Sequence, residues 1–154
     1  LVTPVEMQFV MSTVVRRGQV CQPQVEKGTT PRWQELSLQD ESLDLVKEGL
    51  REVCTAGGTS YLFFPVQYEV LCKTGTAEFG AANEQGYRRT HAWFTVAVSR
   101  QPRSDAIAIE EFDPEIVITA LVESDEQQLY KEGSREAAQV ALDVAQWWWG
   151  SGGE

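Results

Sequence analysis

The hydrophobic periodicity of this chain changes from helical spacing to strict alternation and back, and this change constrains the fold most. Three consecutive segments, 68–77, 91–99 and 115–123, have the composition of strands. In the second segment one face carries Ala92, Phe94, Val96 and Val98, and the other carries Trp93 and Thr95. Successive strands between helical segments predict an α+β fold with an antiparallel sheet and flanking helices.

Two helices are predicted before the strands. Thr3-Pro4-Val5-Glu6 supplies a capping hydroxyl, a proline at the first helical position and a glutamate three residues after the cap. We expect that helix to end near Gly18. A second helix is predicted from the spacing of Leu43, Val46, Leu50 and Val53, closed by Gly57-Gly58.

One helix is predicted after the strands, with Ser134 as its cap and Ala137, Ala138, Val140, Ala141, Val144, Ala145 and Trp148 as its apolar positions. We interpret residues 19–41 as a connection and the polar, acidic residues 100–114 as a long surface connection. Residues 1–149 are expected to form part of one domain. Residues 150–154 are expected to be a disordered tail.

Length and charge limit the classes of function. With 154 residues and 42% hydrophobic content, the chain has material for one substantial core. Its formal net charge of -10 argues against non-specific binding to nucleic acid or anionic lipid. No stretch approaches the ~18 apolar residues of a membrane span. Because the chain starts at Leu1 within apparently structured sequence, we interpret it as a fragment, with any anchor outside it.

The three cysteines, Cys21, Cys54 and Cys72, have neither CxxC spacing nor a histidine cluster nearby. An odd number cannot pair completely within the chain, so the cysteines do not fix the compartment. Cys72 could be reactive. The favoured interpretation is a packed strand thiol that points away from any site.

The segment Lys73-Thr74-Gly75-Thr76-Ala77-Glu78 carries the chemistry of the chain, late on a predicted strand. Taken alone, it fits a solvent-facing edge strand with a bulge at Gly75. Lys-Thr-Gly is also one of the three motifs of serine β-lactamases and penicillin-binding proteins. The remaining sequence has to decide between these interpretations.

The chain resembles the class B penicillin-binding proteins, the monofunctional peptidoglycan transpeptidases, in successive segments. Val2-Thr3-Pro4-Val5-Glu6-Met7 resembles their helix opening, and the helix at 45–54 with Gly57-Gly58-Thr59 resembles their second helix and turn. KTGTAE, His91-Ala92-Trp93-Phe94 and Pro114 to Glu123 are similar to their last three strands. The resemblance covers nearly the whole chain, and the His91 form favours the elongation-type enzymes.

This resemblance implies the C-terminal part of a penicillin-binding or serine β-lactamase-like transpeptidase fold, with site residues on one strand. Lys73 and Thr76 are the implied catalytic residues, and Thr74, Gly75 and Thr76 the implied substrate-binding residues. Lys73 would attract the carboxylate of a D-Ala-D-Ala stem peptide or a β-lactam, and both threonine hydroxyls would bind it. Gly75 would let the substrate backbone approach, and the Thr76 N–H would form half of the oxyanion hole.

The nucleophile of that family is absent from this sequence. No serine is followed three positions later by lysine, and none two positions later by asparagine. Both motifs normally precede the Val2-Thr3-Pro4 region, so we expect an N-terminal truncation and an inactive isolated chain. A penicillin-recognising sensor or β-lactamase-like domain remains an alternative, as does a non-catalytic interaction module.

Other conspicuous residues are interpreted as structural. His91, the single histidine, is expected at a strand start without a catalytic role. At least one residue of the run 147–149, three adjacent tryptophans, should pack at a helix end, since adjacent residues cannot share one helical face. The carboxylates Asp105, Glu110, Glu111 and Asp113 fit no calcium loop. No metal and no cofactor are implied.

The resemblance also implies a location and partners. The full protein would work at the extracytoplasmic face of the bacterial membrane, anchored by a segment outside this chain, with cell-wall elongation partners. The partners of the chain would be a peptidoglycan stem peptide or a β-lactam and the missing N-terminal part of the domain. Without that part, residues 116–122 form an exposed β-branched edge, which predicts self-association through this segment or by a swap of the terminal helix between copies.

Overall fold

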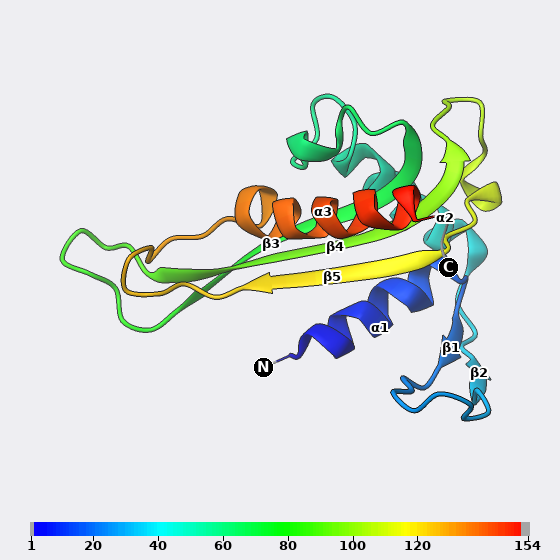
Figure 1. The fold of residues 1–154 in the computed structure, drawn as a ribbon, viewed down its shortest axis with the longest axis horizontal. Coiled ribbons are helices and arrows are strands. Elements are labelled where there is room, and N and C mark those ends of the chain that lie inside the picture. The colour runs from blue at the N-terminus through cyan, green and yellow to red at the C-terminus, as the bar shows by residue number, and fades with distance from the viewer. Residues whose placement is uncertain (1, 152–154) are drawn as a thin grey trace.

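A computed structural model of the chain describes residues 2–151. It has an α+β fold in which three antiparallel strands, ordered β3-β4-β5, form the main sheet. Helices α1 and α3 lie on opposite faces of this sheet (Figure 1). The elements that build it are α1 (Pro4–Val15), α2 (Asp40–Val53), β3 (Tyr68–Phe79), β4 (Arg89–Pro102), β5 (Ile116–Val122) and α3 (Ala138–Gly150). The predicted fold class is confirmed.

Helix α1 begins as the sequence predicts, with a complete capping box. The backbone N–H of Glu6 donates to Thr3 Oγ1 at 3.3 Å, and the Glu6 carboxylate accepts from the Thr3 N–H at 2.7 Å. These two bonds satisfy backbone donors that the first turn leaves without helical partners. The cap therefore fixes where the chain enters the face of the sheet opposite α3.

The prediction that 19–41 is mere connection was wrong. Strands β1 (Gln19–Cys21) and β2 (Trp33–Glu35) pair antiparallel as a small separate sheet, seen at the lower right of Figure 1. Gly18, at φ +87°, turns the chain out of α1, and its carbonyl accepts from the Leu36 N–H at 2.9 Å. Three-residue strands are too short to show an alternating pattern, so periodicity could not reveal them.

Residues 100–114 also differ from the prediction of a surface connection. Strand β4 extends to Pro102, and the short 3₁₀ turn η2 (Ile109–Glu111) follows. Ile109 and Phe112 are buried, each 4% exposed, and they pack with Met11 of α1 and Leu71 of β3. Because the neighbours of these two apolar residues in sequence are acidic, the composition of the segment indicated a polar surface loop.

The start of the last helix corrects the predicted cap at Ser134. The chain first makes a wide π-type turn, η3 (Gly133–Ala137), and the Glu136 carboxylate accepts from the Glu132 N–H at 2.8 Å. The cap is therefore a glutamate that reaches back, and the Ser134 side chain makes no capping bond. Helix α3 continues through Gly150, one residue past the boundary expected at 149, and the Ser151 N–H donates to the Trp147 carbonyl at 2.9 Å. Residues 152–154 of the predicted tail lie outside the described residues.

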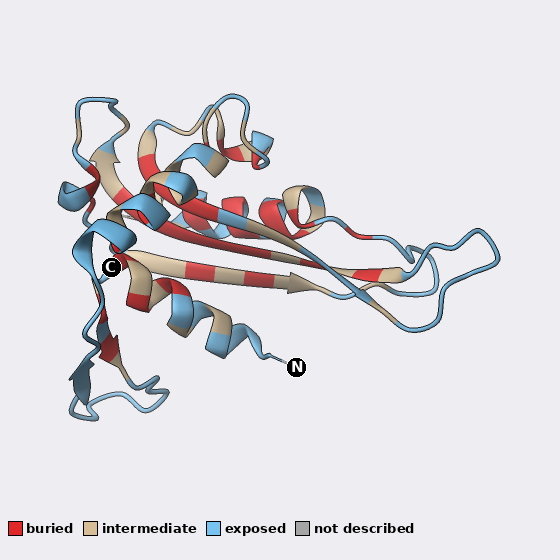
Figure 2. Ribbon diagram, turned by 180° about the vertical axis from the view of Figure 1, so that it is seen from behind, coloured by how far each residue is buried: buried red, intermediate tan, exposed pale blue. Residues whose placement is uncertain are grey.

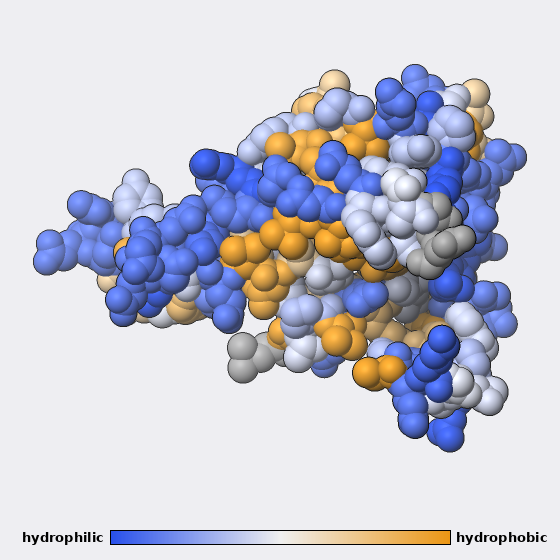
Figure 3. Space-filling model, in the orientation of Figure 1, coloured by the Kyte–Doolittle hydropathy of each residue, from blue (hydrophilic) through white to orange (hydrophobic). Residues whose placement is uncertain are grey.

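The sheet carries one apolar cluster on each face, and Figure 2 shows the buried residues along its strands. The larger cluster joins the alternate residues of β4 that were predicted to share a face to α3, through Ala138, Ala141 and Ala145. Alanines at these positions let the helix lie close to the strands. Val140 and Val144, two of the apolar positions named for this helix, are exposed at 46% and 38%. Figure 3 shows apolar side chains gathered over α3 and the neighbouring β5 edge, whereas the end of the β3–β4 hairpin is hydrophilic.

A disulfide joins the end of α2 to β3. Cys54 and Cys72 are both fully buried and bonded to each other, 18 residues apart in sequence. The prediction of Cys72 as a free packed thiol is therefore wrong in its chemistry, although its burial is confirmed. The pairing could not be derived from spacing, because three cysteines allow several partners. Cys21 is free.

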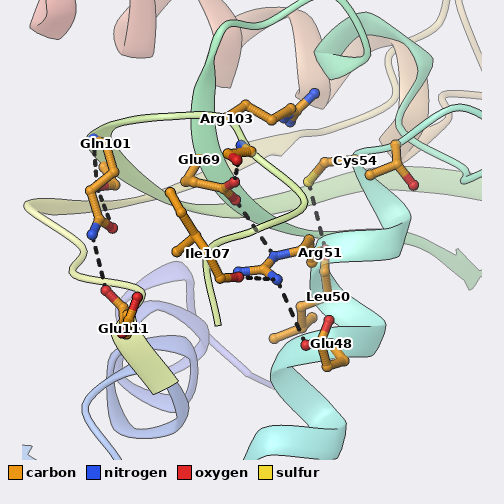
Figure 4. Close-up of polar contacts among 12 residues, drawn as sticks. Glu48, Leu50, Arg51, Cys54, Glu69, Gln101, Arg103, Ile107 and Glu111 are labelled. Atoms are coloured by element: carbon orange, nitrogen blue, oxygen red, sulfur yellow. Dashed lines mark hydrogen bonds and ion pairs between the residues drawn. The ribbon is translucent and has the colours of Figure 1, made fainter. Parts of the chain in front are cut away.

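A buried ion pair lies beside this disulfide, one helical turn earlier on α2 (Figure 4). Arg51 Nε lies 3.5 Å from a carboxylate oxygen of Glu69, which is 2% exposed. The other Glu69 oxygen accepts from the Ser104 N–H at 2.8 Å, and Arg51 Nη1 donates to the Ile107 carbonyl at 3.1 Å. The pair thus connects α2, β3 and the loop after β4. No helix within 2–151 is long and apolar enough to cross a membrane.

Lys47 of α2 is 1% exposed. Burial lowers the pKa of its ammonium below the usual 10.5, with a further lowering from Arg17 that Asp44 and Glu110 partly oppose. Because the folded state disfavours the charged form, Lys47 destabilises the fold at neutral pH. This cost disappears as pH rises from the lowered pKa towards 10.5, because the unfolded state then loses its proton as well.

Lys47→Met should therefore raise the free energy of unfolding at pH 7, and this gain should shrink as pH approaches 10.5. Urea unfolding between pH 7 and pH 10.5 measures both effects. Lys27→Met, at an exposed position of the 19–41 segment, is the matched control and should change stability little at any pH. A Lys47→Met protein that is less stable than wild type at pH 7 would contradict this account.

Candidate substrate-binding site

The Lys73 to Thr76 segment lies on β3, at one edge of the main sheet. Among the described residues β3 pairs only with β4, and the pairing is continuous from Val70 to Phe79. The bulge considered at Gly75 is therefore absent. The only irregularity lies between Tyr68 and Val70. The other edge of β3 is left with unpaired backbone groups.

Backbone groups of this edge are directed outwards at alternate residues. Lys73 Nζ donates to the carbonyl oxygen of Thr74 at 2.8 Å. Residues two apart on an antiparallel strand direct their N–H and C=O groups to the same side. The backbone N–H of Thr76 therefore lies on the same side as the Thr74 carbonyl.

The side chains of the segment divide between the two faces of β3. Leu71 packs in the cluster under α1, whereas Val70 and Cys72 pack in the cluster under α3. By alternation, Thr74 and Thr76 lie on the α3 face, and Lys73 and Gly75 on the α1 face. The two hydroxyls therefore lie on the same face, and the ammonium of Lys73 folds back to the Thr74 carbonyl.

An open apolar groove of about 430 Å³ borders the segment. Its walls come from α1, α2, β3 and β4, and the lining residues include Met7, Val10, Met11, Val46, Leu50 and Trp93 together with 73–77. Val10 and Val46 are about half exposed, at 53% and 48%. An apolar hollow of this size beside a strand edge has room for a protein segment or a ligand.

Gly133 braces the opposite face of the segment, and the sequence analysis missed it. A Cβ at this position would lie 2.3 Å from the Trp93 carbonyl oxygen and 2.4 Å from that of Gly75. The absence of a side chain lets the turn before α3 touch the strand backbone at Gly75. Thr90 Oγ1 holds this turn by exchanging hydrogen bonds with the backbone of Lys131, at 2.8 and 2.7 Å.

Thr59 is a second residue that the sequence analysis left without a role. It follows Gly57-Gly58 in the turn after α2, and its Oγ1 lies 3.1 Å from Thr74 Oγ1. Gly58 is required in this turn, because a Cβ there would lie 2.2 Å from the Glu52 carbonyl oxygen. The glycine pair in the sequence signals such a turn, but nothing in the sequence indicates that the turn meets the strand.

The residues interpreted as structural have structural contacts. His91 Nδ1 accepts from the Ser124 N–H at 3.1 Å. The imidazole stacks on the ring of Phe79, with 4.0 Å between the ring centroids. Trp148 Nε1 donates to Glu115 and Trp149 Nε1 to the Ser99 carbonyl, which confirms packing at the helix end. Within 2–151 no three His, Cys, Asp or Glu side chains lie close enough to hold a metal ion.

The sequence matches a family model described as the penicillin binding protein transpeptidase domain, over residues 1–146. This chain belongs to that family. No curated protein sequence gives a significant match.

Solved transpeptidase structures share the fold. The penicillin-binding protein PBP2 of Helicobacter pylori, in complex with MreC, is 23% identical, with a TM-score of 0.70 over 97% of this chain. PBPA of Mycobacterium tuberculosis is 19% identical, with a TM-score of 0.61 over 94%. The transpeptidase domain of Burkholderia pseudomallei penicillin-binding protein 3 is 17% identical, with a TM-score of 0.59 over 94%.

The matched region is only part of each of these proteins. The chain spans 25% of the Helicobacter chain, 32% of the Mycobacterium chain and 42% of the Burkholderia transpeptidase domain. More than half of even the last, a single domain, thus has no counterpart in this sequence. At these identities the likeness shows the fold.

Gly133→Ala should destabilise the fold by roughly 1–3 kcal/mol, because the added methyl overlaps strand backbone that cannot rotate away. Gly49→Ala is the matched control. A Cβ on this exposed glycine of α2 meets nothing within 4 Å, so that change should stabilise by about 0.5–1 kcal/mol. Thermal and urea unfolding measure both. Equal changes in the free energy of unfolding at the two positions would show that Gly133 does not support the strand.

Proposed function

We propose that this chain is the C-terminal part of a penicillin-binding D,D-transpeptidase. The complete enzyme cross-links peptidoglycan stem peptides through an acyl-serine intermediate, with the serine outside this chain. The observation that carries the proposal is the open edge of β3, where the backbone of Thr76 and the hydroxyls of Thr74 and Thr76 accompany a lysine. Such an edge suits an extended peptide that adds as a further strand.

Each residue of the segment has a role in this proposal. The Lys73 ammonium draws the terminal carboxylate of a D-Ala-D-Ala peptide, or of a β-lactam, to the edge. The hydroxyls of Thr74 and Thr76 donate to that carboxylate. Gly75 keeps the approach free of a side chain, and the Thr76 N–H stabilises the oxyanion that forms when serine attacks the carbonyl.

The rest of the transpeptidase domain, in this proposal, packs into the apolar groove between α1, α2 and β3. The groove lies directly beside the Lys73 to Thr76 segment, and its lining is apolar and partly exposed. A nucleophilic serine carried on that part would then stand next to the substrate edge. The absence of any S-x-x-K or S-x-N in this sequence is consistent with that division of the site.

A location outside the cytoplasm also belongs to the proposal. The buried Cys54–Cys72 disulfide supports it, because stable disulfides form in oxidising compartments. The anchor would be a segment outside this chain. Cell-wall elongation partners are proposed by analogy with the Helicobacter PBP2, whose structure was solved with MreC.

Two other functions compete with this one. A penicillin-recognising sensor or β-lactamase-like domain would use the same edge for the same carboxylate. Unlike a transpeptidase, such a domain would not join two stem peptides. A non-catalytic interaction module would bind a partner through the groove and would not depend on Lys73. The chemistry of the complete protein with a stem peptide and with penicillin separates the three.

The complete protein should be labelled covalently by a fluorescent penicillin, and the isolated chain should not, because acylation requires an activated serine. Lys73→Ala in the complete protein should lower the acylation rate by roughly two orders of magnitude or more. Lys27→Ala, which removes an exposed lysine distant in sequence, is the control and should label normally.

Gel fluorescence after denaturation measures the label. Stoichiometric labelling of the isolated chain would place the nucleophile within it. Normal labelling of Lys73→Ala would remove that lysine from the site.

We further propose that the isolated chain self-associates through residues 116–122. Strand β5 is the other edge of the main sheet within the described residues, and Figure 3 shows apolar side chains beside it. An uncharged, β-branched edge recruits another strand. Ile118 is unsuitable for testing this edge, because it is 8% exposed and packs under α3.

Leu121→Lys places a charge on β5 at a position opposite Trp93 that neither core cluster includes. Light scattering should show wild-type chain assembling with concentration and Leu121→Lys remaining monomeric. Circular dichroism checks that the variant is folded. A wild-type chain that stays monomeric at millimolar concentration would refute self-association.

A further inference from the structure

The turn after α2 meets the substrate edge through a single polar contact. Thr59 Oγ1 lies 3.1 Å from Thr74 Oγ1, and Thr59 is exposed whereas Thr74 is half-buried. A hydroxyl has one proton to donate and two lone pairs that accept. In a pair of hydroxyls, one proton is therefore used within the pair, and the other remains free for a third group.

The direction of the hydrogen bond between Thr59 and Thr74 decides whether Thr74 can donate to a bound anion. If Thr74 donates to Thr59, the Thr74 proton is consumed and only lone pairs face a carboxylate. If Thr59 donates to Thr74, the Thr74 proton is free to point at the anion, and the chain of hydrogen bonds strengthens it. A bound carboxylate selects the second arrangement, because it accepts and cannot donate.

The Cys54–Cys72 disulfide fixes the distance between the two hydroxyls. Cys54 ends α2 five residues before Thr59, and Cys72 lies two residues before Thr74. Within the turn, the Ser60 N–H donates to the Val53 carbonyl at 2.9 Å and the Gly58 N–H to the Thr55 carbonyl at 2.9 Å. The covalent bond and these turns leave the Thr59 side chain little freedom relative to β3.

We propose that Thr59 is a positioning residue for substrate binding: it orients the Thr74 hydroxyl towards the substrate carboxylate, and the Cys54–Cys72 disulfide holds it in place. The inference rests on the proposed transpeptidase function and extends its binding site to a residue outside β3. Thr59 itself does not have to touch the substrate.

The test uses the complete protein that carries this chain. Stopped-flow labelling with a fluorescent penicillin separates the dissociation constant of the initial complex from the acylation rate constant. The same penicillin with its carboxylate as a methyl ester serves as the second probe. A loss of general structure would weaken both probes, whereas a loss of the oriented hydroxyl weakens only the free acid.

Thr59→Val should raise the dissociation constant of the free acid by roughly two- to tenfold, the effect of one hydrogen bond. It should leave the acylation rate constant and ester binding unchanged, and Thr59→Ser should restore wild-type binding. The variant Cys54→Ala/Cys72→Ala should weaken free-acid binding to a similar extent. Adding Thr59→Val to it should cause no further loss, because both changes act through one contact.

The Thr59 arm keeps both cysteines and tests the proposal even if the disulfide variant does not fold. Unchanged free-acid binding by Thr59→Val, or equal weakening of acid and ester, would overturn it. If the losses of free-acid binding add up in the combined variant, the disulfide does not act through Thr59. That result would overturn the proposal that the disulfide holds Thr59 in place. A wild-type protein that penicillin does not label would instead refute the proposed function itself.

Discussion

The attachment of α2 to β3 is the constraint on which the rest of this structure depends. It combines a buried disulfide with the Arg51–Glu69 ion pair, one helical turn apart on the same helix. Closing a loop of this length by a disulfide contributes about 3 kcal/mol in the chain-entropy account. The ion pair fixes geometry more than it adds stability, because removing two charges from water is costly. Together they hold the edge strand against α2.

This attachment matters because the outer edge of β3, where we propose that substrate binds, has only one neighbouring strand among the described residues. β3 pairs with β4 alone among the described residues, so its outer groups stay open for an added peptide. An open edge is also prone to distortion, and three contacts limit that here. The disulfide precedes Lys73, Thr59 meets Thr74, and Gly133 lies against Gly75. All three contacts lie on the α3 face of the strand, so its outer edge stays uncovered.

Much of this arrangement could be predicted from sequence. The Thr3 capping box, the alternation on β4 and the order of strands all follow from local patterns that agree with the final fold. Resemblance then identified the strand that carries Lys73, because several motifs occur in the family's order. Local patterns sufficed wherever one element determined its own conformation.

The missed features around the Lys73 to Thr76 segment depend on contacts between separate segments of the chain. The pairing of Cys54 with Cys72, the approach of Gly133 to Gly75 and the meeting of Thr59 with Thr74 join residues far apart in sequence. Ile109 and Phe112 were missed for the same reason, since their burial depends on α1 covering that face. Hydrophobic periodicity indicates which face of a helix or strand is buried. It does not indicate which turn of the chain contacts that helix or strand.

The central claim is that this edge of β3, held by α2, binds the carboxylate of the substrate. A crystal structure of the complete protein acylated by a β-lactam tests it most directly. The account predicts the β-lactam carboxylate within hydrogen-bond distance of the Thr74 and Thr76 hydroxyls, its acyl oxygen on the Thr76 N–H, and Cys54 bonded to Cys72. An acylated protein whose ligand carboxylate contacts neither threonine would contradict it.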